Sequence, residues 1–316
     1  MTLPSGDHDL RLSYRRRVTQ LQAVEEQPDG TRLPASGLEQ VEVLLGRLEQ
    51  ALDRLWDRSD VYYYDQSASG LRVITMSKWQ WGRLPDDAAP LLGAAREALR
   101  ELWEFASKAA RKAPDCASAL EKLHKVLGRI VEQKGGAPGP IEVVRKHVDG
   151  MIEEYRSTIH RLPSAYGKSE RLLVVDTSAL LDRPDLQNWK LDGGRWTVVF
   201  LPQVHSELDD RKRDDRTRDA AQKVIRQVED FDRRGDTFEG VPLSGRLAVR
   251  EVAISPDMHE TLPWLRADVP DDAVIAGALE LWWRDLTSRV AITASDRNVR
   301  NKARLAGLGA VHPNDL

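Results

Sequence analysis

The chain has 316 residues, and its 47 lysines and arginines nearly balance its 50 aspartates and glutamates. The formal net charge of -3 argues against a protein that coats nucleic acid by bulk charge, but it leaves local basic patches open. The length favours two domains. With Cys116 as the single cysteine, the chain has no internal disulfide framework and no zinc cluster built from thiolates.

The sequence carries no sign of a membrane or secretory protein. No stretch reaches the roughly 18 apolar residues that a membrane-spanning helix requires. The N-terminus lacks the apolar core of a signal peptide. We therefore expect a cytoplasmic protein with no membrane partner, and the lone cysteine agrees with a reducing compartment.

The first half is expected to be mainly α-helical. Residues 1–37 are polar, although 10–24 could form a helix. Apolar side chains then recur at helical spacing in four segments: 38–58, 85–113, 117–133 and 141–161. Residues 61–76 break this period and are typical of a small β-hairpin. The Gly-Gly-Ala-Pro-Gly-Pro run at 135–140 separates the last two helices.

The pattern changes after residues 162–169, the expected linker. Short apolar runs occur at 171–176, 196–202, 247–254 and 289–294, with a weaker one at 310–312. Helical segments at 202–210, 215–235, 271–286 and 296–307 separate them. This alternation indicates a mainly parallel sheet with helices on both faces. We predict a helical domain over residues 1–165 and a three-layer α/β/α domain over residues 166–316.

Four acidic residues are placed to converge on one edge of this sheet. Asp176 ends the first apolar run, and Asp296 follows the run at 289–294. Glu207 lies in the helix after the second run, and Asp272 begins the helix that precedes the run at 289–294. In open parallel sheets the ligand site lies outside the carboxyl ends of the strands. Four carboxylates there would repel one another without a cation, so we predict bound Mg²⁺ or Mn²⁺.

Each acid taken alone has a simpler explanation. Asp176 and Asp296 could cap the helices that follow them, and Asp271 and Asp272 could be ordinary first-turn acids after Pro270. Helix capping is so common that it is favoured for any single position. Four acids at equivalent strand ends are harder to explain in this way.

The same segments resemble the four motifs of PIN domains. Residues 174–182, Val-Val-Asp-Thr-Ser-Ala-Leu-Leu-Asp, are similar to the opening motif, and residues 201–212 to the second. Residues 271–279 resemble the third motif and residues 293–303 the fourth. The second and fourth are most similar to PIN domains fused to ATPase modules, although this chain has no Walker loop. The resemblance covers residues 171–316 and none of the helical half.

This resemblance implies a Rossmann-like sheet and hydrolysis of phosphodiester bonds that depends on Mg²⁺ or Mn²⁺. The expected activity is that of an endoribonuclease acting on single-stranded or structured RNA, with DNA left open as a substrate. Asp176, Glu207, Asp272 and Asp296 match the family's acidic positions. Asp271 is a substitute or partner for Asp272. The hydroxyls of Thr177, Ser178 and Ser295 would support the acids.

Two basic segments flank the acids and suit contacts with phosphate groups. Their members are Arg211, Lys212 and Arg213 in the first segment, and Arg297, Arg300 and Lys302 in the second. Nearby acids, such as Asp209 and Asp210, make solvated helix faces with internal ion pairs an equally good explanation. Five tryptophans could stack on bases, although packing is the simpler role for most of them: Trp189, Trp196, Trp264, Trp282 and Trp283.

Three other functions compete with this interpretation. A toxin ribonuclease paired with an antitoxin is usually a lone PIN domain, so the helical half counts against it. A non-catalytic scaffold, whose helical half binds a protein partner, is disfavoured by the retained acids. A phosphatase of the haloacid dehalogenase type needs a second aspartate where Ser178 stands. We expect the helical half to position a substrate or protein partner, or to mediate self-association into a homo-oligomer.

Overall fold

The computed structural model describes residues 25–26, 32–33, 35–64, 78–111, 113–162, 171–191 and 194–316. These residues group into two units. One is Leu38–Pro163, and the other joins Ser164–Leu316 with the segment that ends at Gly37. In that segment, β1 (Glu25–Glu26) and β2 (Arg32–Leu33) pair in antiparallel fashion. The expected helix at 10–24 and almost all of the expected linker lie outside the described residues.

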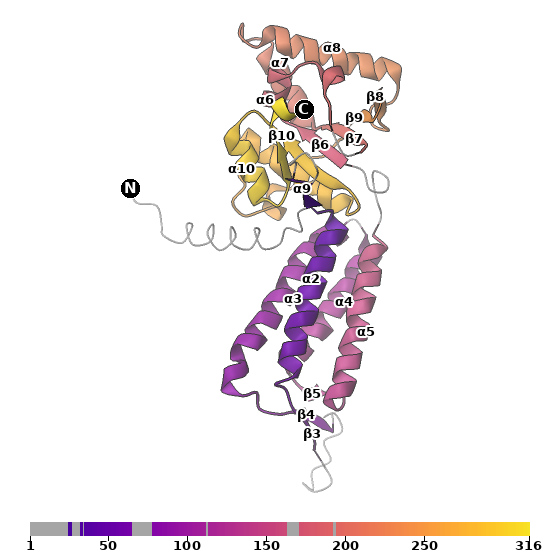
Figure 1. Cartoon of the computed structure of the whole chain (residues 1–316), viewed down its shortest axis with the longest axis vertical. Helices are drawn as coiled ribbons and strands as arrows, with labels where there is room; N and C mark the ends of the chain where they lie inside the picture. The colour runs from indigo at the N-terminus through magenta and orange to yellow at the C-terminus, as the bar shows by residue number, and fades with distance from the viewer. Residues whose placement is uncertain are drawn as a thin grey trace, which may run out of the picture. The chain divides into compact units, whose positions relative to one another are not determined.

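The first unit is built from the four helices that the apolar spacing predicts. They are α2 (Gly37–Trp56), α3 (Ala89–Ala110), α4 (Pro114–Val131) and α5 (Ile141–His160). Figure 1 shows the four helices running along one another. A 3-10 turn at Asp86–Ala88 leads into α3. Each helix buries one apolar stripe; in α2 this stripe includes Leu45, Leu48 and Leu55, all with no exposed area. Packing of these stripes supplies the core of the unit.

Ion pairs join the helices of this unit at its surface. Arg156 on α5 contacts Glu42 at 3.0 Å and Glu49 at 3.1 Å, both on α2. Arg47 on α2 lies 3.8 Å from Glu101 on α3. Half-exposed pairs of this kind contribute little free energy, so the apolar core is what stabilises the bundle.

A small antiparallel sheet belongs to the same unit. Its strands are β3 (Val61–Tyr63), β4 (Trp79–Trp81) and β5 (Gly136–Ala137), in that order. The sequence predicted β3, but placed its partner at 71–75, which lies outside the described residues. Aromatic contacts help to set the observed pairing: Trp81 stacks on Trp56 at 6.0 Å, and Tyr63 meets the edge of Trp79 at 5.3 Å.

The second unit contains a six-stranded sheet. Its strands are β6 (Arg171–Val175), β7 (Trp196–Phe200), β8 (Val241–Ser244), β9 (Leu247–Glu251), β10 (Arg289–Thr293) and β11 (Gly309–Val311). Their order is β11-β10-β6-β7-β9-β8, and every pair is parallel except β8 with β9. Strand β8 was not predicted, because its sequence is short and half-exposed and includes Pro242, which suits an edge strand.

Five helices connect these strands. They are α6 (Thr177–Asp182), α7 (Pro202–Arg211), α8 (Arg218–Arg234), α9 (Pro270–Arg284) and α10 (Arg297–Leu305), with 3-10 turns at Leu186–Asn188, Met258–Glu260 and Pro313–Asp315. Right-handed crossovers place α6 to α8 on one face and α9 with α10 on the other. The contacts agree, because α6 and α7 pack on α8 while α10 packs on α9 (Figure 1). The predicted α/β/α architecture with a mainly parallel sheet is therefore confirmed.

The connections reverse direction at β6. From this strand the chain moves through β7 to β9 on one side, and it returns to β10 and β11 on the other. Such a switch point opens a crevice at the carboxyl ends of the two flanking strands, here β6 and β10. Asp176 directly follows β6, and Asp296 lies three residues beyond β10. No helix in the described ranges combines the length and apolar character needed to cross a bilayer.

Close packing between α9 and the end of β7 generates a prediction about Gly277. A Cβ atom at this position would lie 2.6 Å from Cδ1 of the buried Leu201, whereas one at Gly150 in α5 would meet nothing within 4 Å. We expect Gly277→Ala to lower the free energy of unfolding by about 1 kcal/mol or more. Gly150→Ala should instead raise it by about 0.5 kcal/mol, since alanine favours the helix. Urea unfolding of both variants measures this; equal effects would contradict the packing.

Candidate active site

Asp176 begins the site at the switch point. It is the N-cap of α6, and its Oδ2 accepts a hydrogen bond from the backbone N–H of Ser178 at 3.0 Å. The Ser178 hydroxyl donates to the same oxygen. Burial raises the pKa of Asp176, the bonds from Ser178 lower it, and the charge of Asp296 raises it again. The helix cap is real, yet this carboxylate is also buried beside a second acid.

Hydrogen bonds join the ends of β6 and β10. The backbone N–H of Ser295 donates to the Ser178 hydroxyl at 3.0 Å, and the Ser295 hydroxyl lies 2.5 Å from Oδ2 of Asp182. The N–H of Asp176 donates to the carbonyl of Thr293 at 2.9 Å. These bonds fix the loop that carries Asp296 against the loop that carries Asp176.

Glu207 extends toward this crevice from α7. It is partly buried, and burial raises its pKa, while the Thr177 hydroxyl lowers it and the charges of Asp176 and Asp271 raise it further. The Thr177 hydroxyl is buried and makes no hydrogen bond of ordinary geometry. The Thr177 hydroxyl therefore lies near the Glu207 carboxylate without forming a hydrogen bond of ordinary geometry. Buried hydroxyls usually have a hydrogen-bond partner, so this one is free to bond to an oxygen of a bound ligand.

The two acids at the start of α9 have different surroundings. Asp272 is buried, and its Oδ2 accepts from the backbone N–H of Arg266 at 3.0 Å. Its Oδ1 pairs with Nζ of Lys302 on α10 at 2.5 Å. Asp271 has no such bond among the described residues. Burial raises its pKa, the charge of Asp176 raises it next, and Lys302 partly offsets both.

Asp296 completes the group as the N-cap of α10. Its Oδ1 accepts from the backbone N–H of Asn298 at 2.6 Å, and the residue is exposed. Its charge raises the pKa of both Asp176 and Asp271. Asp176, Glu207, Asp271 and Asp296 are thus linked by repulsion, to which Asp272 adds at Asp271, but Asp272 is also paired directly with Lys302.

This donor set suits a hard divalent cation. Carboxylate oxygens are the ligands that Mg²⁺ and Mn²⁺ prefer. Burial first, and neighbouring acids second, raise the pKa values of Asp176, Glu207 and Asp271, and a bound cation would offset both effects. Within the described ranges, however, no three acidic, histidine or cysteine side chains already lie close enough to enclose an ion. A cation bound here would have to draw the carboxylates closer together.

The six basic residues singled out from the sequence divide into two sets. Lys302 is paired with Asp272, and Nη1 of Arg300 donates to the carbonyls of Ala294 and Ser295, both at 2.6 Å. Lys212 and Arg213 form exposed ion pairs within α7 and its end, with Asp209 and Asp210. Arg211 and Arg297 are exposed without an ion pair to a described residue. These two have the most freedom to contact phosphate.

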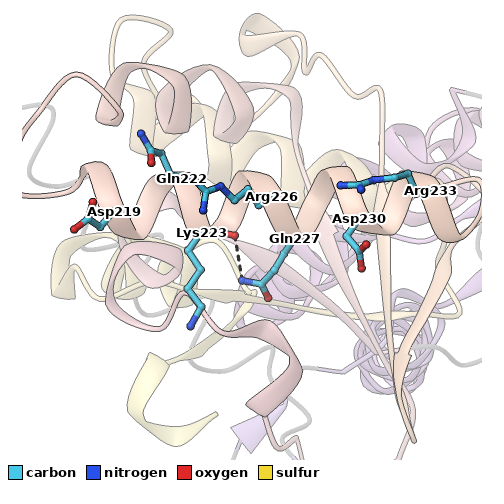
Figure 2. A pocket seen from close by; sticks show the side chains of 7 residues that line it. All are labelled: Asp219, Gln222, Lys223, Arg226, Gln227, Asp230 and Arg233. Atoms are coloured by element: carbon cyan, nitrogen blue, oxygen red, sulfur yellow. Dashed lines mark hydrogen bonds between the residues drawn. The ribbon is translucent and has the colours of Figure 1, made fainter.

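Other surface features offer less for nucleic-acid binding. Trp189, Trp196, Trp282 and Trp283 are buried, so they pack in the fold, and Trp264 is half-buried. A groove follows α8, and Figure 2 shows acidic, basic and amide side chains mixed along it. Asp219 and Asp230 lie among Lys223, Arg226 and Arg233, and Lys223 pairs with Asp185 at 3.2 Å. Mixed charge of this kind does not form a continuous phosphate track.

Comparison with known proteins identifies the domain. Residues 173–313 match the family model of the PIN domain. This part of the chain is a PIN domain. The PIN family consists generally of nucleases that typically use divalent metals, which agrees with the carboxylates at the switch point. The match does not extend into the helical unit. No curated protein matches the chain.

Some features of the PIN domain were not anticipated from the sequence. The pairing of Lys302 with Asp272 was not predicted, because the two residues lie 30 positions apart and both were interpreted as functional groups. Asp182 was noticed only as part of the opening motif, and its contact with Ser295 joins α6 to the loop after β10. For Asp271, the sequence offered only its position beside Asp272, directly after Pro270, as a sign that it belongs to the site.

Asp271 and Asp272 have different electrostatic surroundings, and this difference predicts how their substitution changes the stability of the metal-free protein. Asp271→Asn removes a repelled charge, so in EDTA the variant should melt at or above the temperature of the unmodified chain. Asp272→Asn leaves Lys302 without its counter-charge, and it should lower the free energy of unfolding by about 2 kcal/mol. Thermal melting of both variants measures this difference.

The gain in stability expected from Asp271→Asn should depend on pH. The folded state holds the proton of Asp271 more tightly than the unfolded chain, whose carboxyl has a pKa near 3.8. Stability therefore falls as pH rises through the window between these two values, and the penalty is complete above it. The variant should gain most at neutral pH and lose its advantage near pH 4. A gain that is independent of pH would show that charge is not the cause.

Proposed function

We propose that the PIN domain is a metal-dependent endonuclease that hydrolyses phosphodiester bonds, most of all in RNA. The observation that carries this proposal is the set of acids at the switch point, where burial first and neighbouring acids second raise the pKa values of Asp176, Glu207 and Asp271. A fold seldom retains buried carboxylates that repel one another unless they have a positively charged ligand. RNA rather than DNA comes from the family resemblance alone.

We further propose which acids face the metal. Asp176, Glu207, Asp271 and Asp296 would hold Mg²⁺ or Mn²⁺, with Asp271 in the position that was assigned to Asp272 from the sequence motifs. Asp272 would act as a positioning residue, since its bonds to Lys302 and to the N–H of Arg266 fix the first turn of α9. When bound, such an ion lowers the pKa of a water molecule and stabilises charge on the phosphate.

The remaining residues have supporting tasks in this proposal. Ser178 and Ser295 hold the loops of Asp176 and Asp296 in register. Arg211 and Arg297 lie at the start of the two flanking basic segments, where an exposed guanidinium can contact a phosphate on either side of the cut. The helical unit would position a substrate or protein partner, or mediate self-association.

Cleavage by the full chain tests this function. We expect hydrolysis of single-stranded or structured RNA with Mg²⁺ or Mn²⁺ and none in EDTA, on a panel that also includes duplex RNA and DNA. Asp176→Asn and Asp271→Asn should lower the rate by more than about 100-fold, which exceeds the usual cost of losing a supporting contact. Asp272→Asn should cost less than either.

Two controls make this assay decisive. Asp219→Asn removes an exposed carboxylate on α8, away from the crevice, and should leave the rate unchanged. The unmodified chain and Asp176→Asn, purified in parallel, exclude a contaminating nuclease, because such a contaminant would be present in both preparations. If Asp176→Asn and Asp271→Asn cleave as fast as the unmodified chain, the proposed site is wrong.

A further inference from the structure

The small sheet of the helical unit exposes a row of tyrosines. Tyr62, Tyr63 and Tyr64 are 50, 52 and 44 % exposed, and they are three of the five exposed large apolar side chains among the described residues. The other two, Val143 and Phe238, are single side chains at other points of the sequence. The sheet lies beyond one end of the four helices (Figure 1). Large exposed side chains grouped in this way are typical of a binding surface.

The strand register shows which tyrosines face away from the helices. Trp81 stacks on the buried Trp56 of α2, so the face that carries Trp81 packs against the helical core. Val61 lies opposite Trp81 in the register and shares this face. Because successive side chains of a strand point to opposite faces, Tyr62 and Tyr64 lie on the outer face of the sheet.

The two outer tyrosines have a spacing that suits stacked bases. Tyr62 and Tyr64 are two residues apart, which separates them by about 6.6–6.8 Å along the strand. Neighbouring bases of a nucleic-acid strand are about 3.4 Å apart when they stack, and a ring inserted between them doubles this separation. Among the described residues, neither tyrosine side chain has a hydrogen bond or a contact with another ring. Both rings are therefore available, and an extended single strand can place one base on each.

A lysine adds positive charge to the same face. The backbone N–H of Tyr64 donates to the carbonyl of Lys78 at 2.6 Å, which continues the pairing of β3 with β4 and places the two side chains on one face. The exposed amine of Lys78 forms no ion pair with a described residue. Asp60, at the other end of this face, accepts a hydrogen bond from the backbone N–H of Val61 at 2.8 Å. An unpaired ammonium beside aromatic rings suits a phosphate of a strand whose bases stack on them.

The size and chemistry of this face favour a nucleic-acid strand over a protein surface. Three half-exposed tyrosines offer roughly 300 Å² of contact area. A stable protein interface buries about 800 Å² on each partner, around a continuous apolar centre. The outer face instead carries aromatic rings, the Lys78 amine and the Gln80 amide, without an aliphatic side chain. Aromatic rings with a cation are sufficient for unpaired bases, which stack one at a time.

We propose that this outer face, formed by Tyr62, Tyr64 and Lys78, binds a single-stranded nucleic acid, with one unpaired base on each ring and a phosphate at Lys78. The inference rests on the proposed function for the reason that this chain binds such a polymer, but stacking requires neither metal nor hydrolysis. It gives the helical unit the task of holding the single strand. The covalent link between the units then raises the concentration of that strand around the PIN domain.

Fluorescence anisotropy of a labelled oligouridylate with the full chain in EDTA tests this proposal. Without metal the acids of the PIN domain repel phosphates, so they add little to the binding. We expect Tyr62→Ala and Tyr64→Ala each to weaken the affinity by about fivefold or more, the usual effect of losing one stacked base. Tyr62→Phe and Tyr64→Phe keep the rings and should keep the affinity. Lys78→Gln should weaken binding and reduce its dependence on salt.

Two controls separate stacking from charge and from aromatic exposure in general. An abasic strand with the same number of phosphates should bind the unmodified chain about fivefold more weakly or worse, because it has no base to stack. Phe238→Ala removes a ring that is 59 % exposed from the PIN domain, and it should leave the affinity for oligouridylate unchanged.

Equal affinity for the abasic strand and for oligouridylate would overturn the proposal, and so would unchanged affinity in both alanine variants. The abasic comparison uses the unmodified chain, so it decides even if a variant fails to fold. Sedimentation velocity examines a second copy as the occupant: alanine variants that change the mass in solution, but not the affinity for RNA, would also overturn it. Binding that depends on the tyrosines, without hydrolysis in Mn²⁺, would refute the nuclease alone. Hydrolysis by a chain whose binding ignores the tyrosines would refute this face alone.

Discussion

Repulsion among carboxylates at the switch point is the constraint on which the account of this protein depends. Asp176 and Asp271 both have pKa values raised by burial and by neighbouring acids. The fold tolerates this cost because packing elsewhere is extensive: Leu172, Val174 and Ile292 of the central strands have no exposed area. A structure that sacrifices stability at one place, in a crevice suited to a ligand, indicates a binding site there.

The adjacent acids on α9 show how one turn of helix can serve two purposes. Asp272 is buried and paired with Lys302, so it fixes α9 against α10. Asp271, one position earlier, is the half-buried acid that responds to the charge of Asp176. Successive residues on a helix point about 100° apart, so only one of the two can face the crevice while the other faces α10. Geometry, rather than residue type, separates the ligand candidate from its support.

The sequence predicted the sheet and its edge well, because continuous apolar runs such as 171–175 and 289–293 have few alternatives to buried parallel strands. The sequence could not show which of Asp271 and Asp272 faces the crevice. That distinction depends on the pairing of Asp272 with Lys302, a tertiary contact across 30 residues. The pairing of β3 with β4 was not predicted either, for a similar reason. Trp81 is held by stacking on Trp56, and neither turn residues nor alternation encode that contact.

Metal binding by the full chain tests the central claim most directly. Isothermal titration with Mn²⁺ should show binding that weakens at least about tenfold in Asp271→Asn and in Asp176→Asn. The ligand assignment predicts a smaller loss in Asp272→Asn, because that variant keeps all four acids that face the crevice. The opposite ranking, with Asp272→Asn losing the metal and Asp271→Asn retaining it, would contradict this account.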